Sequence, residues 1–313
     1  MTRRPRKSRR VFLLPVTHSL PAEIVVPAST ANLGAGFDTL SVALRLYTRV
    51  RVLETMPEKP DTIETVFADG AFSGENRIET AFRYARLQLG AATPGVRIEA
   101  RSDIPKRAGL GSSAAATVAG LKLYGALTRP RAPAEWLPLA SEVEGHPDNA
   151  AASLLGGLTA SCQYEDGHVT AHAWRWPGDV QFVIGTPDVP LDTAHARSVL
   201  PGSVRMRDAV FNLQHAVLFI RALETGRYGE LREAMRDRWH QPFRQPLVPA
   251  LGEAMKLEHP GLLGVCLSGA GPSILALVSS HAAEVAALLG GLYDRLGVSH
   301  TIRVLEAHQP GEH

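Results

Sequence analysis

The segment PKRAGLGSSAAAT, residues 105–117, constrains the fold more than any other part of the chain. Pro105 ends the extended run before it, because proline cannot donate to a sheet ladder. Gly109 and Gly111 permit a tight turn and a close backbone approach, and a helix is predicted from about Ser112 to Leu127. A helix start presents unpaired amides and a positive dipole end, which favour an anion. The segment predicts a phosphate-binding loop or, with no ligand, a strand-to-helix turn with a serine cap. It matches neither a Walker A loop nor GxGxxG.

Composition and charge narrow the function classes. The 313 residues are 45% apolar and 20% charged, which suits one large or two ordinary globular domains. The net charge of +2 favours neither nucleic acid nor membrane as a partner, and no run reaches the roughly 20 apolar residues of a membrane span. The basic start, MTRRPRKSRR, predicts a disordered tail over residues 1–20, with a polyanion-binding arm or a targeting signal as alternatives. Cys162 and Cys266 are expected to be buried free thiols, consistent with a cytoplasmic location.

Hydrophobic periodicity predicts a mixture of strands and helices. Apolar positions from Ile78 to Leu89 form one helical face, and Gly90 is a plausible C-cap. The chain closes on a strand, a glycine turn, a strand, a helix and a strand over residues 262–306, which is typical of a ferredoxin-like unit. The other predicted strands cover residues 22–28, 41–54, 95–105, 157–162, 168–174 and 180–185, with a glycine-rich turn at 28–38. The other predicted helices cover residues 134–144, 193–199, 204–225, 228–239 and 247–257.

Three more motifs accompany the glycine-serine loop: VPASTANLGAGFDTL at 26–40, SEVEGHPDNAA at 141–151 and LSGAGPSILAL at 267–277. Together the four motifs resemble the GHMP kinase superfamily and, within it, the homoserine kinase family, over about residues 22–306. Ala35, Ser41 and Ser273 depart from the usual pattern without removing a functional side chain. The resemblance implies an α+β, two-domain fold: a ribosomal-protein-like ATP-binding domain at 21–177 and a ferredoxin-like substrate domain at 178–313.

The resemblance also implies transfer of the ATP γ-phosphoryl group to the side-chain hydroxyl of L-homoserine, with Mg²⁺ as cofactor. Ser113 and Glu142 are the expected Mg²⁺ ligands, with Glu144 as the alternative carboxylate. The expected catalytic residues are Asp38, Ser113, Glu142 and Asn149. The expected ATP contacts are Pro105, Lys106, Arg107, Ala108, Gly109, Leu110, Gly111, Ser112, Ser113, Ala114 and Ala115. Adenine contacts are expected from Asn76 or the region around Ser73.

An amino-acid substrate needs partners for both its carboxylate and its ammonium group. Arg197 and Arg244 match positions that bind the carboxylate in homoserine kinases, and arginine recognises a carboxylate in bidentate fashion. The full set of expected substrate contacts is Asn32, Asp38, His146, Asp148, Asn149, Thr193, Arg197 and Arg244, with His240 as a weaker candidate. We expect direct transfer, in which Asp38 or Asn149 orients the hydroxyl, rather than general-base catalysis by Asp148. The SGAGPS turn is expected to support the phosphate loop, or to be purely structural.

Other functions fit parts of these patterns. Another GHMP kinase, acting on mevalonate, a sugar or shikimate, would share the phosphate loop. A decarboxylase or a non-catalytic sensor on the same fold would lack the Mg²⁺ carboxylate or the serines, and neither is missing. The near-neutral charge argues against nucleic-acid binding. A homodimer is a further expectation.

Overall fold

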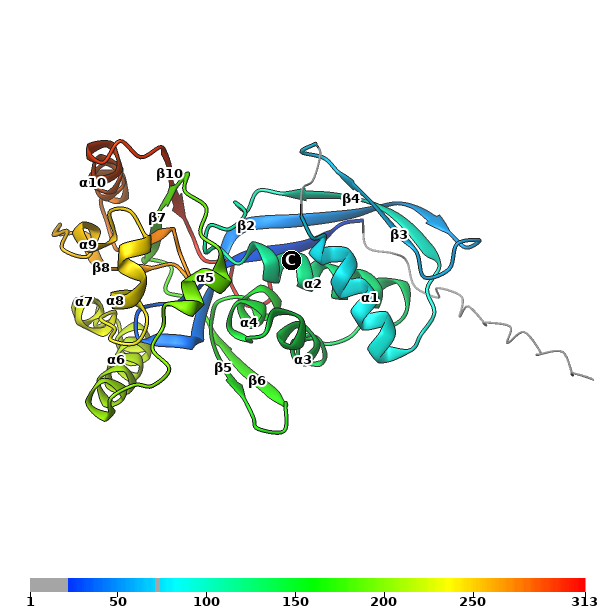
Figure 1. Cartoon of the computed structure of the whole chain (residues 1–313), viewed down its shortest axis with the longest axis horizontal. Coiled ribbons are helices and arrows are strands. Elements are labelled where there is room, and N and C mark those ends of the chain that lie inside the picture. Colours follow the sequence, from blue (N-terminus) through cyan, green and yellow to red (C-terminus); the bar gives the residue numbers. More distant parts are fainter. Residues whose placement is uncertain (1–21, 71–73, 313) are drawn as a thin grey trace, which may run out of the picture.

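The computed structural model describes residues 22–70 and 74–312. Two sheets lie side by side, each with helices packed against it (Figure 1). The predicted tail at 1–20 lies outside the described residues, as does Ser73. Among the described helices, none combines the length and the apolar character needed to cross a membrane.

The first sheet has six strands in the order β3-β4-β2-β5-β6, and β1 also pairs with β2. Among the strands that the structure describes in this sheet, β3 and β4 are parallel and the other pairs are antiparallel. The strands are β1 (Ile24–Asn32), β2 (Gly36–Met56), β3 (Ile63–Phe67), β4 (Gly95–Ser102), β5 (Leu158–Gln163) and β6 (Val169–Trp174). The helices beside this sheet are α1 (Arg77–Leu89), α2 (Ser112–Leu127), α3 (Pro133–Glu144) and α4 (Asp148–Leu155). The Ala-rich α2 is buried almost throughout and packs against both α1 and β1.

The second sheet has four antiparallel strands in the order β10-β7-β9-β8. This order, with a helical crossover between β7 and β8 and α10 between β9 and β10, is ferredoxin-like, as the closing pattern of the sequence predicts. The strands are β7 (Gln181–Pro187), β8 (Leu262–Leu267), β9 (Ile274–Val278) and β10 (His300–Leu305). The helices are α5 (Thr193–Ser198), α6 (Met206–Thr225), α7 (Leu231–Ala234), α8 (Gln241–Arg244), α9 (Leu251–Ala254) and α10 (Ala282–Arg295), with the 3-10 turns η1 (Tyr228–Glu230) and η2 (Gln245–Leu247).

The two halves of the chain are in contact beyond the single loop that links them. After β10 the chain returns to the six-stranded sheet, where the Gly157 amide donates to the His308 carbonyl at 2.7 Å and the His308 amide donates to the Ala43 carbonyl at 3.0 Å. One hydrophobic core also includes residues from both sheets, among them Val42 and Phe182. The division at residue 177 therefore stays a prediction, and the last described residues pack with the first half.

Several local predictions are wrong for identifiable reasons. The turn predicted at 28–38 shrinks to Leu33–Ala35, because β1 and β2 pair as far as Asn32 and Gly36. The helix predicted at 228–239 ends at Ala234, since the Asp237 carboxylate binds three following amides and turns the backbone.

The helix predicted at 247–257 is reduced to α9, because Ala250 adopts a left-handed conformation with φ +65°. Strand β3 and helix α8 were not predicted. Cys266 is buried, and burial raises the pKa of its thiol, but Cys162 is exposed on β5, so one of the two expected buried thiols is wrong.

Candidate active site

The glycine-serine loop lies against the second glycine turn, SGAGPS. Gly109 has φ +74°, and a Cβ at this position would lie 2.3 Å from the Ser268 carbonyl oxygen. The Ser268 hydroxyl donates to the Gly109 carbonyl at 2.7 Å, and the Ser273 amide donates to the Ala108 carbonyl at 3.2 Å. Two motifs about 160 residues apart thus form one layer. Only glycine, which has no Cβ, fits at position 109 in this layer.

The start of α2 has the features of an anion site. Gly111 precedes the helix with φ +65°, no side chain caps the first turn, and that turn contains no acidic residue. The serine cap considered as an alternative is therefore absent. The amides of the first turn and the dipole of a 16-residue helix face the loop. Of the expected ATP contacts, Ala108, Leu110, Ala114 and Ala115 are buried and anchor the loop, whereas Lys106 and Arg107 are exposed.

A carboxylate and two hydroxyls meet beside the same helix start. The Ser113 hydroxyl donates to Glu144 Oε1 at 2.9 Å, and the Thr117 hydroxyl donates to the same oxygen at 2.6 Å. Thr117 was not predicted, although it follows Ser113 by one helical turn, which places both on one face. Carboxylate and hydroxyl oxygens are hard ligands of the kind that Mg²⁺ prefers, so these residues fit the ion.

Glu142 does not join this cluster, contrary to the expected pairing with Ser113. It accepts a hydrogen bond from the Tyr84 hydroxyl on α1, and burial together with that bond raises the pKa of Tyr84 to about 12. Residues two apart on a helix face different sides, so only one of Glu142 and Glu144 can face Ser113. Glu144 is the one that faces Ser113, and which of the two holds Mg²⁺ stays a prediction.

A charged cluster lies at the turn between β1 and β2. Asp38 accepts two hydrogen bonds from Arg197, at 2.8 and 3.0 Å. The Asp38 amide donates to Asn32 Oδ1 at 3.0 Å, and Asn32 Nδ2 donates to the Gly269 carbonyl at 2.8 Å. This chain of contacts joins the β1–β2 turn to the SGAGPS turn, and the SGAGPS turn in turn contacts the glycine-serine loop. The hydrogen bonds that Arg197 donates to Asp38 also raise the pKa of Arg197.

Arg244 is a buried cation within this cluster. Its side chain is 1% exposed, yet it forms no ion pair with any carboxylate in the described part of the chain. Its Nε donates to the Ala196 carbonyl at 2.9 Å, and its Nη1 donates to the Gly269 carbonyl and to His240 Nδ1, both at 3.3 Å. Burial and then the charge of Arg197 lower the pKa of Arg244 to about 10. Asp38, Asp237 and Asp148 attract this charge from a distance without pairing with it. A buried charge without a direct ion pair is unfavourable, which marks this place as suited to an anion.

The HPDN segment lies at the start of α4. Asp148 Oδ1 accepts hydrogen bonds from His146 Nδ1 at 2.7 Å and from the Asn149 amide at 2.7 Å. Burial opposes protonation of His146, but the hydrogen bond to Asp148 and the negative charges of Asp148 and Asp38 together outweigh it and raise the pKa of His146. Asn149 Oδ1 accepts from the Ser29 hydroxyl at 2.8 Å and would lie 3.1 Å from a Cβ at Gly111. Asn149 therefore lies against the glycine-serine loop, whereas Asp148 organises the turn.

Three other residues expected to contact the acceptor or the adenine ring differ in burial and in their hydrogen-bond partners. Thr193 begins the short helix that carries Arg197 and is exposed. His240 is fully buried beside Arg244. Asn76 caps α1, and its Nδ2 donates to Thr65 and Glu79 at 3.0 Å, so its adenine contact stays a prediction.

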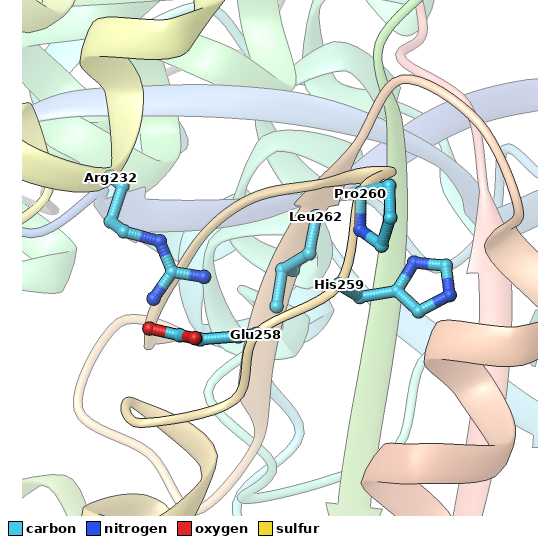
Figure 2. Close-up of a pocket in the computed structure, with 5 residues that line it drawn as sticks. All are labelled: Arg232, Glu258, His259, Pro260 and Leu262. Atoms are coloured by element: carbon cyan, nitrogen blue, oxygen red, sulfur yellow. The ribbon is translucent and has the colours of Figure 1, made fainter.

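A separate hollow of about 400 Å³ opens between α7 and β8. Figure 2 shows the residues that line it: Arg232, Glu258, His259, Pro260 and Leu262. None of them belongs to the expected site, and none contacts the glycine loops or the charged cluster in a hydrogen bond or ion pair that the structure records.

Comparisons with known proteins agree with this geometry. A family model for the GHMP kinases N terminal domain matches residues 76–157, and one for the GHMP kinases C terminal region matches residues 219–290. The chain is 37% identical over 287 residues to a homoserine kinase of Moorella thermoacetica, covering 90% of this chain and 95% of that relative. It is 42% identical over 256 residues to a homoserine kinase of Solibacter usitatus, covering 80% and 83%.

The fold is similarly close to solved structures. A homoserine kinase from Cytophaga hutchinsonii superposes with a TM-score of 0.81 at 26% identity, covering 94% of this chain and 98% of that one. A mevalonate kinase superposes with a TM-score of 0.67 at 17% identity, which shows a shared fold alone. The α+β class and the two-sheet arrangement are thereby confirmed.

Proposed function

This chain belongs to the homoserine kinase family of the GHMP kinases, and from that premise we propose that it phosphorylates the side-chain hydroxyl of L-homoserine with ATP. The products are O-phospho-L-homoserine and ADP, as in threonine biosynthesis. The structural observation that carries the proposal is the buried Arg244, a cation without a carboxylate partner that is linked through Gly269 to the phosphate loop.

The loop at 105–115 holds the ATP phosphates mainly through backbone amides at the start of α2. Gly109 and Gly111 let the phosphates come close to the backbone, and the contact with Ser268 keeps the loop rigid. Ser113 and Glu144 are the residues that would hold Mg²⁺, with Thr117 fixing the Glu144 carboxylate. When bound, Mg²⁺ neutralises charge on the transferring phosphates.

The acceptor binds at the charged cluster through both ends of its amino-acid group. Its carboxylate pairs with Arg244 and the accessible side of Arg197, and its ammonium group lies near Asp38. Charge-assisted hydrogen bonds of this kind contribute about 1.5–3 kcal/mol each. A neutral sugar would leave Arg244 without an anion, and mevalonate, which has a carboxylate but no ammonium group, would leave Asp38 without a new partner.

The reaction is a direct transfer. The substrate oxygen forms a bond to the γ-phosphorus while the bond to the β-phosphate oxygen breaks, and the hydroxyl proton passes to phosphate or to water. Asn149, which lies against Gly111, orients the hydroxyl. We assign Asp148 to the turn rather than to base catalysis, since its Oδ1 accepts hydrogen bonds from His146 and Asn149.

An ADP-release assay with L-homoserine, L-threonine, L-serine, mevalonate and galactose tests this function. We expect turnover to be highest with L-homoserine. Turnover with mevalonate or galactose and none with L-homoserine would refute the substrate and leave the phosphotransfer in place. The homodimer stays a prediction, which sedimentation equilibrium tests directly.

A further inference from the structure

The ring of Phe37 lies beneath both arginines of the charged cluster. The guanidinium carbon of Arg197 lies 5.6 Å from the ring centroid, and that of Arg244 lies 5.4 Å from it. The face of an aromatic ring attracts cations at such distances. Phe37 immediately precedes Asp38 at the start of β2, yet the binding roles described above make no use of its ring.

His240 adds a second ring to this contact. Its imidazole stacks on Phe37, with centroids 5.3 Å apart and an interplanar angle of 28°. Its Nε2 bonds to the Gly34 carbonyl at 2.8 Å, and its Nδ1 bonds to Arg244 Nη1 at 3.3 Å. A carbonyl only accepts and a guanidinium only donates, so the imidazole must be neutral with its proton on Nε2. Burial lowers the pKa of His240, which favours the same neutral form.

The cluster needs such support because two guanidinium groups share one small space. Asp38 neutralises Arg197 through two hydrogen bonds, whereas Arg244 has no carboxylate partner among the described side chains. Repulsion between the exposed Arg197 and the buried Arg244 favours separation of the two side chains. A neutral aromatic surface can hold both cations near each other without adding a competing anion.

We propose that Phe37 and His240 together act as a platform that positions Arg197 and Arg244 to bind the carboxylate of the acceptor. The proposal rests on the proposed function, since it assigns these residues to that carboxylate. Both are positioning residues, because they act through the arginines. Their contribution is to substrate affinity, and neither touches the phosphate loop by a contact that the structure records.

The chain offers a matched control for Phe37. Phe211 on α6 stacks on His215 with centroids 3.7 Å apart, and the guanidinium carbons of Arg238 and Arg236 lie 3.8 and 5.6 Å from its ring. Phe211 thus has the same kinds of neighbours as Phe37, one imidazole and two arginines, but lies outside the charged cluster. Comparing Phe37→Leu with Phe211→Leu separates positioning of the substrate from a general effect of losing such a stack.

The experiment measures KM for L-homoserine, KM for ATP and kcat for the wild type, Phe37→Leu, Phe37→Tyr and Phe211→Leu. Phe37→Leu is expected to raise KM for L-homoserine about tenfold through loss of the two cation–π contacts. Its KM for ATP and its kcat should stay within about twofold, and Phe37→Tyr, which keeps the ring, should stay within about threefold of the wild type. Phe211→Leu should leave KM for L-homoserine unchanged.

An unchanged KM for L-homoserine in Phe37→Leu overturns the platform, as does an equal rise in Phe211→Leu or a parallel rise in KM for ATP. If Phe37→Leu does not fold, Phe37→Tyr still decides, because a rise beyond about tenfold with the ring retained contradicts a role for the ring face. A wild type without turnover of L-homoserine overturns the proposed function and the platform together. If the wild type turns over L-homoserine but one of the contrary results above is found, only the platform is overturned.

Discussion

Substitution of Gly109 by alanine tests how strictly the two glycine loops fit together. The added Cβ would lie 2.3 Å from the Ser268 carbonyl oxygen, 2.8 Å from the Gly271 carbonyl oxygen and 3.0 Å from the Gly271 amide nitrogen. All three atoms belong to backbone, so no side-chain rotation relieves the overlap. One of the two loops must therefore move.

The size of the effect follows from that overlap. An ordinary contact begins at 3.4 Å, so the nearest pair must separate by the difference between 3.4 and 2.3 Å, which is 1.1 Å. A displacement of about 1 Å near a reacting group lowers activity by about 100-fold. The left-handed conformation of Gly109 adds about 1–2 kcal/mol of strain for any residue with a Cβ.

Gly90 supplies the control because its φ of +76° nearly equals the +74° of Gly109, and no atom lies within 4 Å of its would-be Cβ. Both alanine variants should lose about 1–2 kcal/mol of unfolding free energy from the backbone conformation. Only Gly109→Ala should also lose about 100-fold in kcat/KM for ATP. Steady-state kinetics and urea denaturation measure the two effects. Activity of Gly109→Ala within about threefold of Gly90→Ala would refute the reasoning.

Three further predictions concern the acidic residues and His146. Glu144→Gln should lower Mg²⁺-dependent turnover by about 100-fold, with Glu142→Gln within about threefold, in a Mg²⁺ titration of each; equal losses would contradict the choice of Glu144. Asp148→Asn should lower kcat less than about 1,000-fold, and a larger loss would indicate a general base. The pKa of His146 is raised in the folded state, so its stabilising effect is full below the unfolded value of about 6.5 and is lost as pH rises through the folded pKa. His146→Gln should therefore destabilise the fold more at pH 5.5 than at pH 8.5 in urea denaturation, and a loss that does not vary with pH would exclude a charged His146.

The sequence predicted the elements whose pattern is local. The small-residue helix at 112–127 appears with the same bounds, because Pro105 and the glycines define its start and a continuous apolar run sustains it. The ferredoxin-like order of the second half was also readable, since strand, glycine turn, strand, helix and strand follow one another directly.

The parts that depend on distant contacts were not predictable in the same way. Nothing in the letters SEVEG shows that Tyr84 on α1 engages Glu142 and leaves Glu144 to Ser113. Ser29 and Thr30 read as turn residues, yet both are fully buried within β1. The turn at Asp237 arises from its bonds to amides further along the chain, and helix periodicity alone continues past it.

The account depends most on Arg244 as the partner of the acceptor carboxylate. The decisive measurement is kcat/KM of the wild type and of Arg244→Gln with L-homoserine and with 3-aminopropan-1-ol, which lacks only the carboxylate. We expect Arg244→Gln to lower kcat/KM for L-homoserine by about 100- to 1,000-fold, the effect of breaking a buried charge pair. It should leave kcat/KM for 3-aminopropan-1-ol and KM for ATP unchanged. Equal losses with both acceptors, or an unchanged preference for L-homoserine, would contradict the account.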